Sequence, residues 1–195
     1  MPRSSWNTGT LVEGQKVRNF WDDDEIALDP RASVQAEDDG EDTYDGPFGD
    51  REFDVFAEAV AEIESGGQYD IEGGYNNHYQ GKYQFGRTAL KDVGIGFTPE
   101  EREAFRNDPN LQETAFQSFT HQNHKTLLRY SKKYRQLNQR QQLGILALAH
   151  NAGAGAGGAL EFLRSGKDTT DGFGTKGTRY VDAVAKAFNQ GGAAA

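Results

Sequence analysis

The first fifty residues of the chain carry its whole net charge, and this confines a packed fold to the remainder. Residues 1–50 hold 13 aspartates and glutamates against 4 lysines and arginines, whereas residues 51–195 hold 17 of each kind. The acidic runs 22–25 and 37–42 show no apolar periodicity, so this segment cannot bury enough surface to offset the entropy of ordering it. We expect an extended or disordered acidic arm over 1–50, a folded domain over 51–190 and a frayed tail over 191–195.

The arm also contains large apolar side chains. Both tryptophans of the chain, Trp6 and Trp21, lie in it together with Phe20. Aromatic anchors within a polar segment are typical of arms that become ordered against a partner. A solubilising tail and a docking segment are therefore the two alternatives for this part of the chain.

Composition excludes several classes of protein. The absence of cysteine excludes disulfides and thiolate chemistry. The balanced charge of residues 51–195 gives no reason to expect a nucleic-acid-binding face, and no apolar run is long enough to span a membrane. The N-terminus lacks the hydrophobic segment of a secretory signal, so a substrate outside the cytoplasm would have to be reached by a route other than standard export.

The body predicts a mainly α fold with few strands. Residues 69–85 are rich in Gly, Asn and Tyr, which indicates a loop or a short hairpin. Thr98-Pro99 and Asp108-Pro109 each combine an N-capping side chain with a proline in the first turn, and both indicate the start of a helix. The expected helices cover residues 53–64, 88–93, 99 onward, 109–130, 139–150, 159–163 and 178–189.

Glu64 ends the first predicted helix on its apolar side. The apolar stripe of this helix consists of Phe53, Phe56, Val60 and Ile63. At about 100° per residue, Glu64 falls only about 40° from this stripe, whereas Glu58 and Glu62 fall on the far side. Burial raises the pKa of a carboxyl group, which then holds a proton near neutral pH and can donate it, as the cleavage of a glycosidic bond requires. The alternative is a carboxylate at the edge of the core that pairs with an arginine.

Four short motifs follow one another along the chain. They are Glu64-Ser65-Gly66-Gly67, Gly81-Lys82-Tyr83-Gln84-Phe85-Gly86, Ala147-Leu148-Ala149-His150-Asn151-Ala152-Gly153 and Thr178-Arg179-Tyr180-Val181. In this order they resemble the motifs of lytic transglycosylases related to goose-type lysozymes, over about residues 53–182. Two details differ from the family pattern, which usually has tyrosine in place of His150 and one more residue between Thr178 and Tyr180.

The resemblance implies a lysozyme-like helical domain and a peptidoglycan-degrading enzyme that uses neither a metal nor a cofactor. Glu64 would protonate the glycosidic oxygen between N-acetylmuramic acid and N-acetylglucosamine. It would then act as the base while the C6 hydroxyl of the muramic acid attacks, which gives a 1,6-anhydro product. A second carboxylate opposite Glu64, for which Asp70 and Glu72 are candidates, would instead permit hydrolysis.

The resemblance also implies a set of substrate-binding residues around Glu64. They are Ser65, Tyr83, Gln84, Phe85, Asn151 and Tyr180. Gln84 can bind an N-acetyl amide, orient Glu64 or make a structural hydrogen bond under its loop, and Asn151 can bind an N-acetyl group or cap a helix. Tyr180 can hold the carboxyl group of Glu64 or serve as a core tyrosine. Of Tyr83 and Phe85, we expect one to face sugar and the other to face the core.

The missing export signal and the anchored arm suggest a phage protein that is carried in the virion. It would act on glycan strands in the host periplasm and cell wall during DNA ejection, and the arm would dock to other virion proteins. One alternative is an endolysin-type muramidase released at lysis. The other is a catalytically inactive lysozyme-fold protein with a structural or wall-binding role in the virion.

Overall fold

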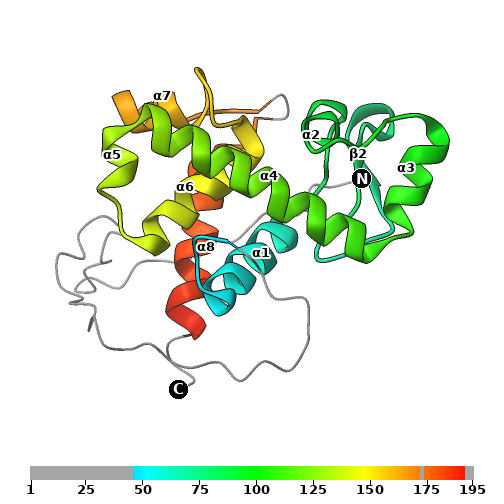
Figure 1. The fold of residues 1–195 in the computed structure, drawn as a ribbon, viewed down its shortest axis with the longest axis horizontal. Coiled ribbons are helices and arrows are strands. Elements are labelled where there is room, and N and C mark those ends of the chain that lie inside the picture. Colours follow the sequence, from blue (N-terminus) through cyan, green and yellow to red (C-terminus); the bar gives the residue numbers. More distant parts are fainter. Residues whose placement is uncertain (1–45, 172–173, 192–195) are drawn as a thin grey trace, which may run out of the picture. The chain divides into compact units, whose positions relative to one another are not determined.

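The computed structural model describes residues 46–171 and 174–191, and these residues are mainly helical (Figure 1). The helices are α1 (Asp50–Glu64), α2 (Arg87–Asp92), α3 (Pro99–Arg106), α4 (Pro109–Tyr130), α5 (Lys132–Arg135), α6 (Gln139–Ala152), α7 (Ala159–Ser165) and α8 (Thr178–Gly191). The predicted mainly α class is thus confirmed. None of these helices combines the length and the apolar character that crossing a bilayer requires. The expectations for the arm up to residue 45 and for the tail from residue 192 lie outside the described residues.

The middle of helix α6 is buried on all sides and forms the centre of the core. Every residue from Leu143 to Ala149 is buried, and α6 packs against α1, α4, α7 and α8. An apolar surface around the whole circumference is what a helix in the middle of a domain requires. A capping box between Asn138 and Gln141 fixes its start. Its last turn, which carries His150 and Asn151, is therefore held by the packed core.

Helices α1 and α8 pack against each other. The buried side of α1 includes Phe53, Phe56 and Val60, as the apolar stripe predicts, whereas Ile63 is half-buried. Val184 of α8 is fully buried and Phe188 is nearly so. Burying one such side chain contributes about 1.5–3 kcal/mol. This packing holds the end of α1 close to the start of α8.

Helix α4 runs from α3 at one end to α5 and α7 at the other (Figure 1). Its bounds match the sequence prediction, because Asp108 accepts a hydrogen bond from the backbone N–H of Leu111 and Pro109 occupies the first turn. The start of α3 at Pro99 is confirmed as well, and Thr98 and Glu101 form a capping box there.

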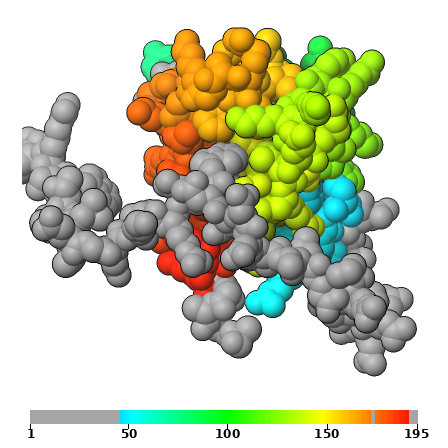
Figure 2. Space-filling view, turned by 90° about the vertical axis from the view of Figure 1, so that its left-hand side faces the viewer, coloured from blue at the N-terminus to red at the C-terminus, as the bar shows by residue number. Residues whose placement is uncertain are grey.

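Helix α5 is not among the helices that the sequence predicts. Ser131 caps it, and the fully buried Tyr134 anchors it to the core through a hydrogen bond of 2.8 Å to His124. Figure 2 shows the face of the molecule on which α5, in yellow-green, lies beside the segment around α7, in orange.

Phe48, which the sequence places in the arm, is buried and its ring contacts that of His124 at a centroid distance of 5.0 Å. The packed part of the chain therefore includes at least two residues before α1 begins at Asp50.

A short hairpin leads into the second motif. Strands β1 (Glu72–Gly73) and β2 (Tyr79–Gln80) pair antiparallel, with the 3₁₀ turn η1 (Tyr75–Asn77) between them. The motif turn that follows, residues 81–86, is attached to α4 by the fully buried side chain of Gln112. The Oε1 atom of Gln112 accepts from the backbone N–H of Lys82 at 2.7 Å, and Nε2 donates to the carbonyl groups of Phe105 at 2.9 Å and Arg106 at 3.1 Å. Gly81 is required at this contact, because a Cβ atom there would lie 2.1 Å from Oε1 of Gln112.

A polar cluster stabilises the outer side of the same turn. The ammonium group of the buried Lys82 lies 2.8 Å from Oε1 of Glu58 and 3.0 Å from Oε1 of Glu113. Tyr69 and Tyr83 each donate a hydrogen bond of 2.6 Å to the Glu113 carboxylate. Glu58 is mostly exposed, as the helical pattern predicts, yet its carboxylate also completes this cluster.

Replacing Gln112 with leucine should destabilise the protein strongly. The substitution conserves volume but removes the Gln112 partner of the buried Lys82 N–H and of the carbonyl groups of Tyr69 and Arg106, which costs about 2–4 kcal/mol in the free energy of unfolding. Urea unfolding followed by circular dichroism measures this change. Gln117→Leu, at a half-buried position of the same helix, is the control and should change the stability by less than about 0.5 kcal/mol. Equal effects of the two substitutions would contradict the proposed attachment.

Candidate active site

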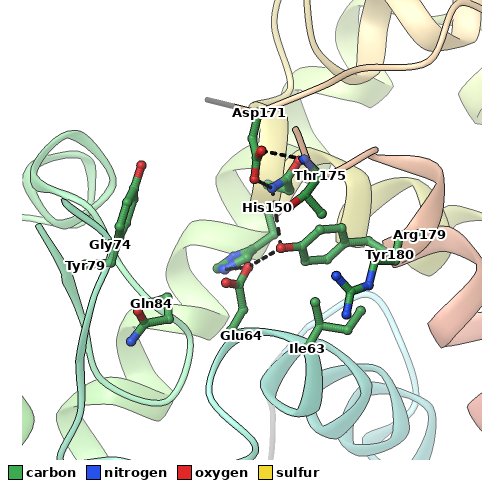
Figure 3. Close-up of a pocket in the computed structure, with 11 residues that line it drawn as sticks. Ile63, Glu64, Gly74, Tyr79, Gln84, His150, Asp171, Thr175, Arg179 and Tyr180 are labelled. Atoms are coloured by element: carbon green, nitrogen blue, oxygen red, sulfur yellow. Dashed lines mark hydrogen bonds and ion pairs between the residues drawn. The ribbon is translucent and has the colours of Figure 1, made fainter. Parts of the chain in front are cut away.

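A cavity of about 440 Å³ lies where the ends of three helices meet the motif turn (Figure 3). The end of α1, the turn at residues 81–86, the end of α6 and the start of α8 all contribute to it. Its lining consists of Ile63, Glu64, Gly74, Tyr79, Gln84, His150, Asn151, Asp171, Thr175, Arg179 and Tyr180. In Figure 3, Tyr79 and Gln84 stand on one side and Glu64, Tyr180 and Arg179 on the other.

The carboxyl group of Glu64 lies largely out of water. Its side chain is 15% exposed, and Oε1 accepts a hydrogen bond of 2.9 Å from the hydroxyl of Tyr180. Burial, assisted by the negative charge of Asp171, raises the pKa of Glu64 to about 7, although the hydrogen bond from Tyr180 and the charge of Arg179 oppose this shift. Glu64 thus keeps its proton between about pH 4.5 and 7, where an ordinary glutamate has lost it.

A chain of hydrogen bonds extends from Glu64 to Asp171. The hydroxyl of Tyr180 accepts from Nδ2 of Asn151 at 3.4 Å, and the same nitrogen donates to Oδ2 of Asp171 at 3.3 Å. The backbone N–H of Thr175 donates to Oδ1 of Asp171 at 2.7 Å. Both hydrogens of the Asn151 amide are thereby engaged. Its Oδ1 atom is buried and has no hydrogen-bond partner among the described residues.

His150 is a neutral neighbour of Glu64. Its Nε2 atom lies 2.8 Å from the carbonyl oxygen of Tyr83, and since a carbonyl only accepts, Nε2 must carry the proton. Burial lowers the pKa of His150 to about 4, and the hydrogen bond to Tyr83 opposes this only in part. The separation of 3.6 Å between Nε2 and Oε1 of Glu64 is therefore not an ion pair at neutral pH. The rings of Phe85, Phe116 and Phe119 surround the imidazole with centroid distances between 5.5 and 5.9 Å.

Gln84 is held in a fixed position across the cavity from Glu64. Its backbone has φ = 47°, in the left-handed region that non-glycine residues rarely adopt. Its backbone N–H and its Nε2 atom both donate to the carbonyl of Gly81, at 3.0 and 2.9 Å. Gly73 makes room for the side chain, because a Cβ atom there would lie 1.8 Å from Oε1 of Gln84.

The predicted site residues thus separate into two groups. Glu64, Gln84, Asn151 and Tyr180 line the cavity, and substrate contact by any of them stays a prediction.

Ser65, Tyr83 and Phe85 do not line this cavity, although substrate contact by them stays a prediction as well. The Ser65 hydroxyl donates to the Lys82 carbonyl at 2.7 Å, and thereby ties the end of α1 to the motif turn. Tyr83 is fully buried, and its ring stacks on that of Phe116 with a centroid distance of 3.9 Å. Phe85 is 1% exposed and its ring packs edge-on against that of Phe105.

The cavity also contains residues that the sequence did not single out. Asp171 is the acidic residue that lines it besides Glu64, whereas Asp70 and Glu72 do not line it and form ion pairs with Arg106. Asp171 lies in a polar, glycine-rich loop without a recognisable motif, so the sequence carried no signal for it. Tyr79 lies two residues before Gly81, and its position next to the second motif was a signal from which its place in the site could have been predicted.

The described residues contain no group of three histidine, aspartate or glutamate side chains that could hold a metal ion. Comparison of the chain with protein-family models, with curated proteins and with solved structures gave no significant match.

Replacing Glu64 with glutamine should stabilise the protein in a pH-dependent way. Folding raises the pKa of Glu64 from 4.5 to about 7, so the folded state keeps a proton that the unfolded chain releases. The wild type therefore loses stability relative to Glu64→Gln as the pH rises from about 4.5 to 7. Above about pH 7 the free energy of unfolding of Glu64→Gln should exceed that of the wild type by about 3 kcal/mol.

Urea unfolding of both proteins at pH 4, 5.5, 7 and 8 measures this difference. Glu62→Gln, at an exposed position of the same helix turn, is the control and should show no such change. A difference between Glu64→Gln and the wild type that stays constant with pH would mean that Glu64 titrates normally.

Proposed function

We propose that the protein is a peptidoglycan-degrading lytic transglycosylase with a lysozyme-like domain and Glu64 as its catalytic acid. The observation that carries this proposal is the convergence of four motifs that lie far apart in the sequence. Each motif contributes at least one residue to the lining of the same cavity, and these residues include Glu64, Gln84, Asn151 and Tyr180. Within that cavity the carboxyl group of Glu64 has a pKa near 7, which suits a general acid at neutral pH.

The hydrogen bond from Tyr180 determines where the acidic proton resides. Because the hydroxyl of Tyr180 donates to Oε1 of Glu64, Oε1 is the accepting oxygen and the proton of the neutral acid lies on Oε2. As the C1–O bond to the leaving sugar breaks, this proton passes to the glycosidic oxygen and Glu64 becomes a carboxylate. The carboxylate then takes the proton of the muramic acid C6 hydroxyl while O6 bonds to C1. The product is a 1,6-anhydro sugar, and Glu64 regains its proton.

Asn151 supplies a position for an N-acetyl group. Its buried Oδ1 atom has no hydrogen-bond partner among the described residues, while its Nδ2 atom is engaged by Asp171 and Tyr180. An unpaired buried acceptor costs about 1–3 kcal/mol, and a rotation of the Asn151 amide toward the cavity would let the acetamido N–H of a bound sugar remove this penalty. The same hydrogen bond would place the sugar in contact with the acid, because Asn151 and Glu64 share Tyr180.

Glu64→Gln should abolish the release of products from purified peptidoglycan. Loss of a general acid costs at least about a hundredfold in rate, while Glu62→Gln should retain wild-type activity because its side chain is exposed. Mass spectrometry of the released muropeptides should show 1,6-anhydro ends in the wild-type digest. Activity that survives Glu64→Gln would refute the site. A wild type without any product would favour a catalytically inactive wall-binding or structural protein.

Hydrolysis by a muramidase mechanism is the second candidate, and the position of Asp171 favours it. Asp171 lines the same cavity as Glu64 and raises its pKa, so a second carboxylate is available that could activate water. Asp171→Asn separates the two mechanisms. In a transglycosylase the anhydro products should persist, whereas a muramidase should release reducing ends and lose about a hundredfold in rate.

We also propose that the enzyme acts from a phage particle on the host cell wall. The support is the acidic segment 1–50 with Trp6, Phe20 and Trp21, which suits docking to other virion proteins better than catalysis. Removal of residues 1–45 should leave cleavage of purified peptidoglycan intact and abolish incorporation into particles, measured by immunoblotting of purified virions. Normal incorporation would contradict docking through this segment. Presence of the full-length protein in lysates but never in particles would favour an endolysin.

A further inference from the structure

A second cavity of about 250 Å³ adjoins the site that holds Glu64. The two cavities share four lining residues, which are Tyr79, Gln84, His150 and Asn151. From this common wall the second cavity extends to the start of α2, where His78, Arg87 and Thr88 line it. A ligand that occupies the first cavity can therefore reach the second without leaving the surface of the protein.

The guanidinium group of Arg87 is held in place by an aromatic ring. It lies over Phe97 at 4.8 Å from the ring centroid, while the guanidinium of Arg102 lies 5.3 Å from the same centroid. The ring of His78 is 5.6 Å from that of Phe97. Cation–π contacts of this kind orient an arginine without using its N–H donors.

Arg87 has no carboxylate partner within the part of the chain that the structure describes. The nearby arginines differ, because Arg106 lies 2.6 Å from Glu72 and Arg102 lies 4.0 Å from the same carboxylate. The first cavity contains the carboxyl groups of Glu64 and Asp171, whereas no acidic residue lines the second. The end of the groove at Arg87 therefore has an uncompensated positive charge and free hydrogen-bond donors.

We propose that this second cavity is a subsite for a carboxylate on the lactyl-peptide substituent of the glycan strand, an inference that rests on the proposed function. Each N-acetylmuramic acid of peptidoglycan carries a lactyl group that is usually extended by a peptide with free carboxylates, while the alternating N-acetylglucosamine is neutral. Arg87 presents a planar fork of donors that matches a carboxylate. The subsite thus selects strands by the charge next to the sugar whose glycosidic bond is cleaved.

The first test compares two substrates with the unmodified enzyme. Soluble, uncrosslinked peptidoglycan strands are used as they are, or after carbodiimide coupling to methylamine, which converts their carboxylates into neutral amides. The wild type should cleave the native strands roughly three- to tenfold faster at low substrate concentration, the effect of one partly exposed charge-assisted hydrogen bond. Equal rates on the two substrates would overturn the proposal.

The second test uses variants on α2. Arg87→Ala should lose the preference for native strands, and Arg87→Lys should restore part of it because the charge returns without the fork. Lys91→Ala is the matched control, since Lys91 is an exposed cation of the same helix that lines neither cavity. It should keep the full preference. If Arg87→Ala lowers the cleavage rate equally on native and amidated strands, the role of Arg87 is structural and the proposal is overturned.

A binding measurement separates this inference from the proposed function. In the Glu64→Gln background no turnover is expected, and calorimetry compares native and amidated strands with and without Arg87→Ala. A wild type that cleaves nothing would refute the enzymatic proposal, while a charge-dependent affinity that requires Arg87 would still support the subsite. Equal affinities, or no binding of either strand, would overturn it.

Strands treated with an N-acetylmuramoyl amidase identify the source of the carboxylate. They lack the peptide and expose the lactyl carboxylate itself. Retained dependence on Arg87 would show that the subsite also accepts the lactyl carboxylate, which is an amide in peptide-bearing strands, and lost dependence would show that it requires a carboxylate of the peptide.

Discussion

The hydrogen bond between Tyr180 and Glu64 connects the two helix ends on which the site depends. Glu64 is the last residue of α1, and Tyr180 lies in the first turn of α8. The two helices pack along their apolar sides, so the polar contact forms at the end of a hydrophobic interface. Its geometry is set by the burial of side chains such as Phe56 and Val184, which contribute far more energy than the hydrogen bond itself. The site is therefore positioned by the core and only adjusted by its own polar contacts.

The opposite wall of the cavity is built in a different way. The motif turn at residues 81–86 contains no helix. The rings of Tyr83 and Phe85 anchor it in the core, and buried polar groups fix its backbone. Gln112 reaches it from α4, the Lys82 ammonium bridges Glu58 and Glu113, and the Ser65 hydroxyl binds the Lys82 carbonyl. Such fully paired networks specify one conformation, because each alternative would leave a buried donor or acceptor unpaired. This explains how Gln84 can be held at a positive φ angle.

Local patterns in the sequence were sufficient to predict those features that depend on interactions between neighbouring residues. The caps at Thr98 and Asp108 predicted the starts of α3 and α4, and the apolar stripe predicted the inward direction of Glu64. The motifs selected four residues that line one cavity, although their chemical roles stay predictions. Interactions between distant segments were not predictable in this way. Nothing in the local pattern distinguishes Gln112 or Lys82 from solvated polar residues, and Asp171 reaches the cavity only because its loop folds back next to Asn151.

The carboxyl group of Glu64 and the imidazole of His150 lie next to each other and are both buried. Their common burial changes the charges that the two groups carry in the folded state. Burial raises the pKa of Glu64 to about 7 and lowers that of His150 to about 4. Near pH 5.5 the unfolded chain has a cationic imidazole and an anionic carboxylate, whereas the folded chain has both groups neutral. Folding therefore moves one proton from the base to the acid without net exchange with solvent. The stability lost by Glu64 as the pH rises from about 4.5 to 6.5 is offset by the stability that His150 gains over the same interval, so this pair leaves the fold almost insensitive to mild acidification.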